Sequence, residues 1–253
     1  MGFLRKIFSE GNFCVALLAL IPMGLFAQLQ IQDTLPMDLR APLFQPPWED
    51  GRPADMDIGD TGVWAHSAQD YPWRRFMNQA GQAGFLPLWY PLEGLGVPFM
   101  ASGKTRALSP FSLPVYFLPL ETGLRWSVLL KLIVAGWAAY FAARRFPLAA
   151  PMALLAAVAY QCAGPVLGRF DDAISDVLPW MPLLLVGVES LARGERRGWA
   201  WAAAALGLML LGGEPGAAIG AFLIAAVYLA IRCSPRDGRR HAPRALLGLA
   251  AVL

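Results

Sequence analysis

Long apolar runs divided by short charged stretches dominate this chain of 253 residues. Several of these runs approach the ~20 residues that a helix needs to cross the hydrocarbon core of a bilayer. Hydrophobic residues make up 57% of the chain and charged residues only 15%, with a mean hydropathy of +0.46, which is abnormal for a soluble domain. Because a backbone inside lipid must satisfy its own hydrogen bonds, the sequence predicts an all-α polytopic membrane protein.

Seven membrane segments are expected. They lie at residues 13–28, 124–143, 148–167, 177–191, 199–211 and 217–231, with a seventh that begins near 245 and is cut off at 253. The fifth is short enough to be a re-entrant segment instead of a span. Since the seventh is too short to cross a bilayer, we expect residues 1–253 to form one membrane-embedded domain that is incomplete at its C-terminal end.

The basic residues predict the orientation. If each segment crosses once, twelve of the 21 Lys and Arg residues fall on one side, which the positive-inside rule assigns to the cytoplasm. The clusters are Arg5 and Lys6; Arg144 and Arg145; Arg193, Arg196 and Arg197; and Arg232, Arg236, Arg239, Arg240 and Arg244. We therefore expect a cytoplasmic N-terminus and a long first exported loop at about residues 31–121.

The first apolar run also has features of a secretory signal peptide. It follows a basic start and ends with a small residue, Ala27. Cleavage there is an alternative to a first span, and the following loop is exported in both cases.

Several function classes receive no support from the sequence. No basic face outside the membrane would bind nucleic acid, and no phosphate loop or dinucleotide fingerprint indicates a nucleotide cofactor. The three Cys residues give the exported loop no disulfide framework, and the two His residues lie on opposite sides, so no zinc-type cluster is expected. We therefore expect neither a cofactor nor a structural metal.

The exported loop is dense in Pro, Gly and aromatic residues, and it resembles a site held at the membrane surface. Residues 33–53 predict extended coil. Residues 63–79 predict a helix interrupted at Pro72 and lying on the membrane surface, with Trp64, Trp73 and Phe76 at the interface. Residues 113–120 predict a short, half-buried interfacial helix.

Residues 86–110, LPLWYPLEGLGVPFMASGKTRALSP, resemble a conserved block of the bacterial YfhO-like membrane proteins, which are grouped with the GT-C glycosyltransferases. Weaker resemblances are Pro72-Trp73-Arg74, the residues 178–183 (LPWMPL) and the turn at 212–215 (GGEP). The sequence departs from the family at Tyr90, where Asn is usual, and at Gly213-Glu214, where Gly-His is usual. The resemblance covers most of the chain and implies a GT-C-like architecture.

What the resemblance implies is a glycosyltransferase that moves a sugar from a polyprenyl-phosphate donor to an extracytoplasmic glycan, envelope polymer or lipid at the bacterial inner membrane. Such an enzyme needs a general base for the acceptor hydroxyl and cations for the leaving lipid phosphate. It needs no nucleotide. Its expected partners are the lipid-linked donor, the acceptor and membrane lipids.

Asp60 is the first candidate for the base, because the first exported loop of GT-C enzymes carries a catalytic acid. Asp70 is the second candidate. The alternative role of Asp60 is a helix N-cap, and that of Asp70 is a solvated helix face paired with Arg74.

Lys104 and Arg106 are the candidates for binding the donor phosphate, with Arg74 as a weaker one. Anionic lipid headgroups would attract the same residues. Glu214, Trp89 and Tyr90 are further candidates for the cleft, although Trp and Tyr are ordinary in interfacial belts.

Charged residues within or beside the predicted spans leave further alternatives open. Lys131 either faces the bundle interior or snorkels to the interface. Asp171, Asp172 and Asp176 form either a solvated loop, which is the commoner case, or a site for a divalent metal or the acceptor. Intramembrane charge and broken helices also suit a transporter or flippase for lipid-linked glycans, and a non-catalytic membrane assembly protein is a third alternative.

Overall fold

The computed structural model describes residues 2–27, 36, 39, 41–44, 48–51, 66–146, 148–169 and 172–232. The chain divides into two compact units. The first, which we call the bundle unit, combines Met1–Leu25 with Leu129–Leu253, and the second, which we call the loop unit, is Phe26–Val128. Helix α6 is continuous from Leu120 to Arg145, so the loop unit leads into the bundle unit without a linker.

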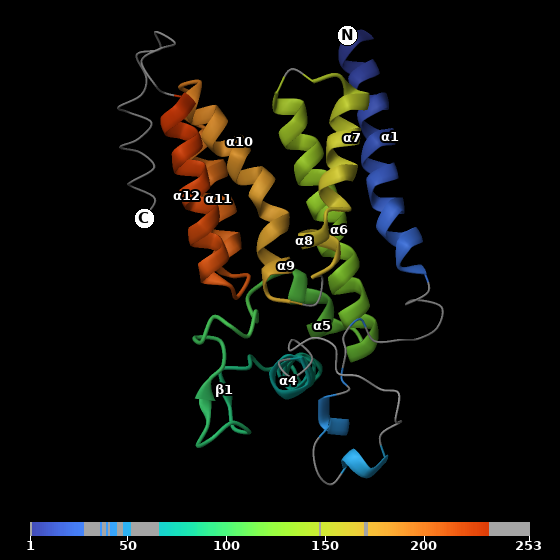
Figure 1. Cartoon of the computed structure of the whole chain (residues 1–253), viewed down its shortest axis with the longest axis vertical. Coiled ribbons are helices and arrows are strands. Elements are labelled where there is room, and N and C mark those ends of the chain that lie inside the picture. The colour runs from blue at the N-terminus through green and yellow to red at the C-terminus, as the bar shows by residue number, and fades with distance from the viewer. Residues whose placement is uncertain are drawn as a thin grey trace. The chain divides into compact units, whose positions relative to one another are not determined.

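The helices of the bundle unit run along one common direction, apart from short turns at their ends (Figure 1). They are α1 (Gly2–Leu25), α6 (Leu120–Arg145), α7 (Ala150–Gln161), α8 (Gly164–Leu167), α9 (Ile174–Val177), a 3-10 turn (Leu178–Trp180), α10 (Met181–Ala192), α11 (Gly198–Leu210) and α12 (Pro215–Arg232).

Every predicted membrane segment that lies in the described residues is helical. Among the residues that the structure describes, three stretches are long and apolar enough to cross a membrane, namely Leu120–Arg145, Ile174–Ala192 and Pro215–Arg232. Gly11–Leu25, Ala150–Gln161 and Gly198–Leu210 are shorter apolar helices. The prediction of an all-α membrane protein is confirmed, and the seventh segment lies outside the described residues.

Small residues bring α10 and α11 into close contact. A Cβ on Gly187 would lie 2.5 Å from the backbone nitrogen of Ala202, and one on Gly198 would lie 2.7 Å from the carbonyl oxygen of Gly187. Close backbone approach of this kind is typical of helices that associate in lipid, because burial of apolar surface there contributes little to helix association. Leu184, Val188, Met209 and further buried side chains from α12 complete this core.

A second core of the bundle unit joins α1, α6 and α7. Leu18, Tyr140 and Ala157 are among its buried residues. Gln161 fixes it with two hydrogen bonds of 2.9 Å, because its Nε2 donates to the carbonyl oxygens of Leu18 on α1 and Leu132 on α6.

The loop unit is built from short elements. These are the 3-10 turns Ala41–Phe44, Trp48–Gly51 and Pro110–Ser112, the π-helical turn His66–Asp70, α4 (Tyr71–Ala83), the strands β1 (Trp89–Tyr90) and β2 (Val97–Pro98), and α5 (Leu113–Phe117). Pro72 lies in the first turn of α4, where no intrahelical donor is lost, so it starts this helix instead of interrupting it. The short helix expected at 113–120 is α5.

An aromatic cluster forms the core of the loop unit, and it changes the expectation for α4. Trp64 lies outside the described residues. Trp73 and Phe76 pack edge-on against the buried ring of Phe99, with ring centroids 6.3 and 5.2 Å away, so they stabilise the loop unit's own core. The large exposed apolar side chains of the loop unit lie mainly downstream of α4.

Candidate functional site

A buried arginine organises the loop that follows the β-hairpin. Arg106 is only 2% exposed and adopts a positive φ of 57°, which is unusual for a residue with a side chain. Its Nη2 donates a hydrogen bond of 2.8 Å to Oδ1 of Asp70, which ends the turn before α4. The two candidate site residues Asp70 and Arg106, separated by 36 residues in the sequence, therefore form an ion pair.

Arg74 extends this polar cluster to α5. Its Nη1 donates to the hydroxyl oxygen of Ser112 at 2.6 Å, and that hydroxyl donates to the backbone carbonyl of Arg106 at 2.7 Å. Arg74 and Ser112 are both buried. The structure thus brings three predicted site residues, Asp70, Arg74 and Arg106, into one cluster, in which Arg106 is the partner of Asp70.

Asn78 lies on the same helix face, and sequence reasoning missed this residue. Its Nδ2 donates to the carbonyl oxygens of Val115 and Leu118, both at 2.7 Å, and so holds the C-terminal end of α5. The spacing of Asp70, Arg74 and Asn78, four residues apart each time, places them on one side of a helix. This spacing was the signal available in the sequence.

An apolar cavity of about 500 Å³ lies beside this cluster in the loop unit. The loop residues Ala107, Leu108 and Ser109 form one wall. The remaining lining residues are Gly81, Gly84, Phe85, Leu86, Met100, Pro110, Leu113, Tyr116 and Phe117. Phe85, Leu86, Leu108, Leu113 and Phe117 are themselves exposed, so apolar surface continues from the cavity to the outside.

Tyr116 joins the cavity to the loop. Its hydroxyl donates to the carbonyl oxygen of Ala107 at 3.1 Å, and burial raises the pKa of the phenol above its ordinary value. A neutral hydroxyl therefore persists at physiological pH and fixes the cavity wall.

The other predicted site residues are distributed as follows. Lys104 is exposed on the loop, three residues before the cavity wall. In β1, Trp89 is 55% exposed whereas Tyr90 is buried against Phe76 and Phe99. Glu214 belongs to the bundle unit and is exposed where α12 begins. Asp60 lies outside the described residues.

Residues 88–211 match the family model described as bacterial membrane protein YfhO. Over this segment, which is just under half of the chain, the sequence is similar to that family, and we call it the YfhO-like segment. The resemblance stated from the PLWYP block is thereby confirmed. No curated protein and no solved structure matches the chain.

The YfhO-like segment contains the hairpin, the Lys104–Arg106 loop, α5 and the helices from α6 through α11. Asp70 and Arg74 precede it. The cluster is therefore built by joining α4 to the loop and α5 of the YfhO-like segment.

The YfhO-like segment also holds a buried ion pair within the bundle unit. Nζ of Lys131 on α6 lies 2.6 Å from Oδ1 of Asp176 on α9, and it donates to the Ser175 hydroxyl at 2.9 Å. Both charged side chains are almost completely buried, Asp176 at 0% exposure. Lys131 therefore faces the bundle interior, and Asp176 differs from the solvated loop residue that was expected. Asp171 lies outside the described residues.

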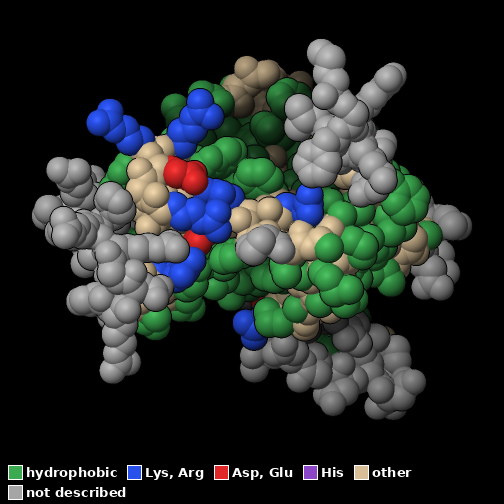
Figure 2. Space-filling view, turned by 90° about the horizontal axis from the view of Figure 1, so that it is seen from above, with side chains coloured by type: hydrophobic (Ala, Val, Ile, Leu, Met, Phe, Trp, Pro, Cys, Tyr) green, Lys and Arg blue, Asp and Glu red, His purple; other side chains and the backbone are tan. Residues whose placement is uncertain are grey.

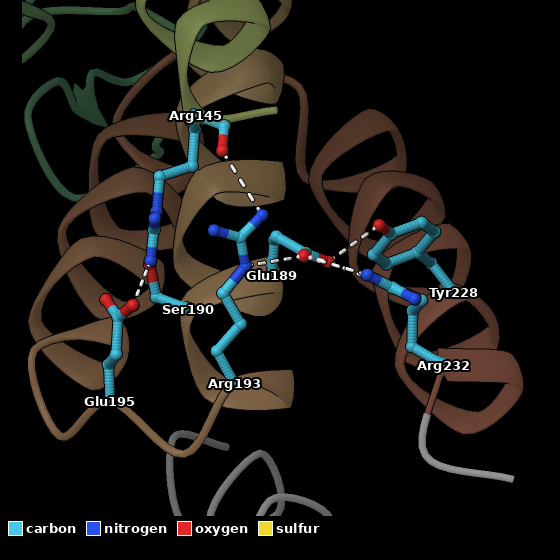
Figure 3. A network of polar contacts seen from close by, with 7 residues as sticks. All are labelled: Arg145, Glu189, Ser190, Arg193, Glu195, Tyr228 and Arg232. Atoms are coloured by element: carbon cyan, nitrogen blue, oxygen red, sulfur yellow. Dashed lines mark hydrogen bonds and ion pairs between the residues drawn. The ribbon is translucent and has the colours of Figure 1, made fainter. Parts of the chain in front are cut away.

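Glu189 in the YfhO-like segment connects the ends of α10 and α12 (Figure 3). Its completely buried carboxylate accepts from Nε of Arg193 at 2.8 Å, from Nη2 of Arg232 at 3.0 Å and from the Tyr228 hydroxyl at 2.9 Å. Nη2 of Arg193 donates to the carbonyl oxygen of Arg145, whose own guanidinium pairs with Glu195.

This network lies at the end of the bundle unit where sequence analysis expects the cytoplasm. Figure 2 shows basic and acidic side chains gathered in one group on the face at these helix ends, with hydrophobic side chains nearby. Sequence reasoning did not single out Glu189, although an acid inside an apolar run is the kind of residue that marks a built interaction.

Metal binding receives no geometric support within the described part of the chain. No group of three or more His, Cys, Asp or Glu side chains there is arranged to hold a metal ion. Asp172 and Asp176 alone would supply too few ligands for a protein-held calcium site.

Proposed function

We propose that the chain acts as a membrane glycosyltransferase that takes a sugar from a polyprenyl-phosphate donor and transfers it to an extracytoplasmic glycan, envelope polymer or lipid. The observation that carries this proposal is the apolar cavity of about 500 Å³, one wall of which, residues 107–109, directly follows Lys104 and Arg106 in the chain. An apolar cavity with cations nearby suits a ligand that is a hydrocarbon at one end and a phosphate at the other.

The lipid end of the donor would enter from the exposed apolar rim. Leu108, Leu113 and Phe117 both line the cavity and are exposed, so an isoprenoid chain would pass from lipid into the cavity without crossing a polar surface. Ligand cavities of a few hundred Å³ with mainly apolar lining typically bury most of a small ligand.

The phosphate end would meet the loop at residues 104–106. Lys104 is exposed and supplies a mobile ammonium, and Arg106 is held in place by Asp70 at 2.8 Å. A guanidinium is a planar group of N–H donors of the kind that recognises phosphate. Asp70 then acts as a positioning residue for Arg106, which leaves Asp60 as the candidate for the base.

In the proposed reaction the acceptor hydroxyl oxygen attacks the anomeric carbon of the sugar. A new glycosidic C–O bond forms while the bond from the anomeric carbon to the phosphate oxygen breaks. The hydroxyl proton passes to the Asp60 carboxylate, and the lipid phosphate leaves with the bonding electron pair. The cations of the loop would stabilise this charge as it develops.

The proposal also states which side of the membrane each part of the chain faces. The N-terminus and the arginine-rich helix ends would face the cytoplasm, and the loop unit would lie outside the bacterial inner membrane. The supporting observation is that Arg193 and Arg232 both donate to Glu189, and Arg193 also donates to the backbone carbonyl of Arg145. These arginines therefore gather at the same helix ends, as the positive-inside rule expects for a cytoplasmic face.

Transfer from a labelled polyprenyl-phosphate sugar by the full-length protein in liposomes tests this function. Asp60→Asn should lower the transfer rate by about 10²–10⁴-fold, the usual contribution of a positioned general base. Glu93→Gln, which removes another carboxylate of the loop unit, is the matched control and should retain activity. Wild-type transfer by Asp60→Asn would eliminate Asp60 as the base, and no transfer by the wild type with any labelled donor would contradict the proposed activity.

The buried Lys131–Asp176 pair favours a second candidate function, the movement of lipid-linked glycans across the membrane. Charged residues buried among membrane helices often mark a transport pathway, and this pair joins α6 to α9. Translocation of a fluorescent lipid-linked glycan in proteoliposomes tests it. A translocation rate that is abolished in Lys131→Met/Asp176→Leu, with transfer absent in the wild type, would favour this function over the first.

A further inference from the structure

The β-hairpin of the loop unit displays large apolar side chains to the outside. Leu92 is 79% exposed and Leu95 is fully exposed at the tip, and Leu86, Leu88 and Trp89 are each more than half exposed. An exposed apolar surface of this kind on one short segment marks a binding surface.

The hairpin holds these side chains in fixed positions. Trp89 pairs with Pro98 and Tyr90 with Val97 in an antiparallel register. Gly94 and Gly96 turn the chain with positive φ values of 58° and 97°, and a Cβ on Gly96 would lie 2.2 Å from the Trp89 indole nitrogen.

The base of the hairpin is anchored in the aromatic core. Tyr90 is buried beside it, with its ring 5.1 Å from that of Phe76 and 5.8 Å from that of Phe99. The tip leucines therefore extend from a hairpin whose base is packed in the core of the loop unit.

The charge pattern indicates lipid as the partner. Between Arg75 and Lys104 the chain carries one charged residue, Glu93. A Trp with a half-exposed indole beside several Leu residues is typical of the boundary between headgroups and acyl chains. A protein-binding surface would be expected to surround its apolar centre with a polar rim.

The position of the hairpin in the chain supports the same partner. The loop unit continues directly into α6, which is a candidate membrane span from Leu120 onward. Leu86, three residues before β1, is exposed and also lines the cavity, so exposed apolar side chains lead from the cavity toward the hairpin along the chain.

We infer that the tip of this hairpin, Leu92 to Leu95, inserts into the headgroup–acyl boundary of the membrane and docks the loop unit on the lipid surface. The inference stands independently of the proposed transfer reaction. Docking by the tip would bring the exposed rim of the cavity to the lipid from which its ligand would enter.

Collision accessibility of nitroxide spin labels tests the insertion. Leu92→Cys and Leu95→Cys would be labelled in the full chain, with Cys14, Cys162 and Cys233 replaced by Ser, in liposomes of phosphatidylethanolamine and phosphatidylglycerol. Gln82→Cys, exposed on α4, is the aqueous control, and Leu223→Cys, exposed on the candidate span α12, is the lipid control.

We expect labels at 92 and 95 to resemble the Leu223 label, with high accessibility to oxygen and low accessibility to a water-soluble nickel chelate. Accessibility to the chelate equal to that of the Gln82 label would overturn the insertion. Low accessibility to both reagents would also overturn it, because the tip would then be covered by protein. Circular dichroism of each labelled variant verifies that the fold is intact.

Discussion

Arg106 and Asp70 form an ion pair in which Nη2 of the nearly buried guanidinium lies 2.8 Å from the carboxylate. This pair ties the turn before α4 to the loop that forms the cavity wall. The sequence suggested Asp70 as a base and Arg106 as a phosphate ligand. In the structure these two residues bind each other. The geometry assigns Asp70 the task of holding Arg106.

Replacing Asp70 by Asn should destabilise the loop unit. It removes the carboxylate that accepts from Nη2 of the buried Arg106 guanidinium, and breaking a buried pair from one side costs about 3–5 kcal/mol, with the lower end expected here because Asp70 keeps some exposure. Thermal unfolding of the purified protein in detergent measures this loss. Glu93→Gln serves as the control, and equal melting temperatures for the two variants would refute the role of the pair.

Replacing Gly187 by Ala should loosen the contact between α10 and α11. The new Cβ would meet the Ala202 backbone nitrogen at 2.5 Å, and overpacking of this kind costs about 1–3 kcal/mol. Gly207→Ala on α11 is the matched control, because no atom lies within 4 Å of its added Cβ. Its melting temperature should stay the same or rise, since Ala is favoured over Gly in a helix by about 0.5–1 kcal/mol.

The Lys131–Asp176 pair should respond very differently to one substitution and to two. Lys131→Met alone leaves a buried carboxylate and should cost about 3–5 kcal/mol, whereas Lys131→Met/Asp176→Leu should be nearly neutral or stabilising. Unfolding of both variants in detergent gives the comparison. If the double variant is as unstable as the single one, the pair is embedded in a wider polar network that includes Ser175.

Glu189 should be far more sensitive to neutralisation than Glu195. Glu189→Gln leaves Arg193 and Arg232 facing an amide, so a loss of about 2–5 kcal/mol is expected. Glu195 is 48% exposed, and Glu195→Gln should cost at most about 1 kcal/mol although it pairs with Arg145. Similar melting temperatures for the two variants would contradict a central role for Glu189.

The helices were predictable because apolar runs of sufficient length have one stable form in lipid. The partner of Lys131 was not predictable. Hydropathy shows that a charge lies within an apolar run, but it does not identify an acid 45 residues away on another helix as the partner. Trp73 and Phe76 were expected at the membrane surface because aromatic residues are common there. In the structure they pack against Phe99, which directly follows the hairpin. Secondary-structure propensity alone does not predict where the hairpin packs.

The candidate site was predictable in part. Residue types suggested Asp70, Arg74 and Arg106 separately, but only tertiary contacts show that Arg106 is buried and paired with Asp70. The cavity depends on how α4, α5 and the loop pack together, and no motif in the sequence encodes it.

Photo-crosslinking tests the central claim, that the cavity of the loop unit holds the lipid part of a polyprenyl-phosphate sugar. The full-length protein in liposomes would be irradiated with a donor that carries a photoreactive group in its isoprenoid chain, and the labelled peptides would be identified by mass spectrometry. Leu108→Arg places a charge on the exposed cavity rim and should weaken donor binding about tenfold, or about 1.4 kcal/mol.

The account predicts that labelling concentrates on residues 107–117, is competed by unlabelled donor and falls in Leu108→Arg. Labelling confined to the bundle unit, or labelling of residues 107–117 that unlabelled donor does not compete, would contradict it.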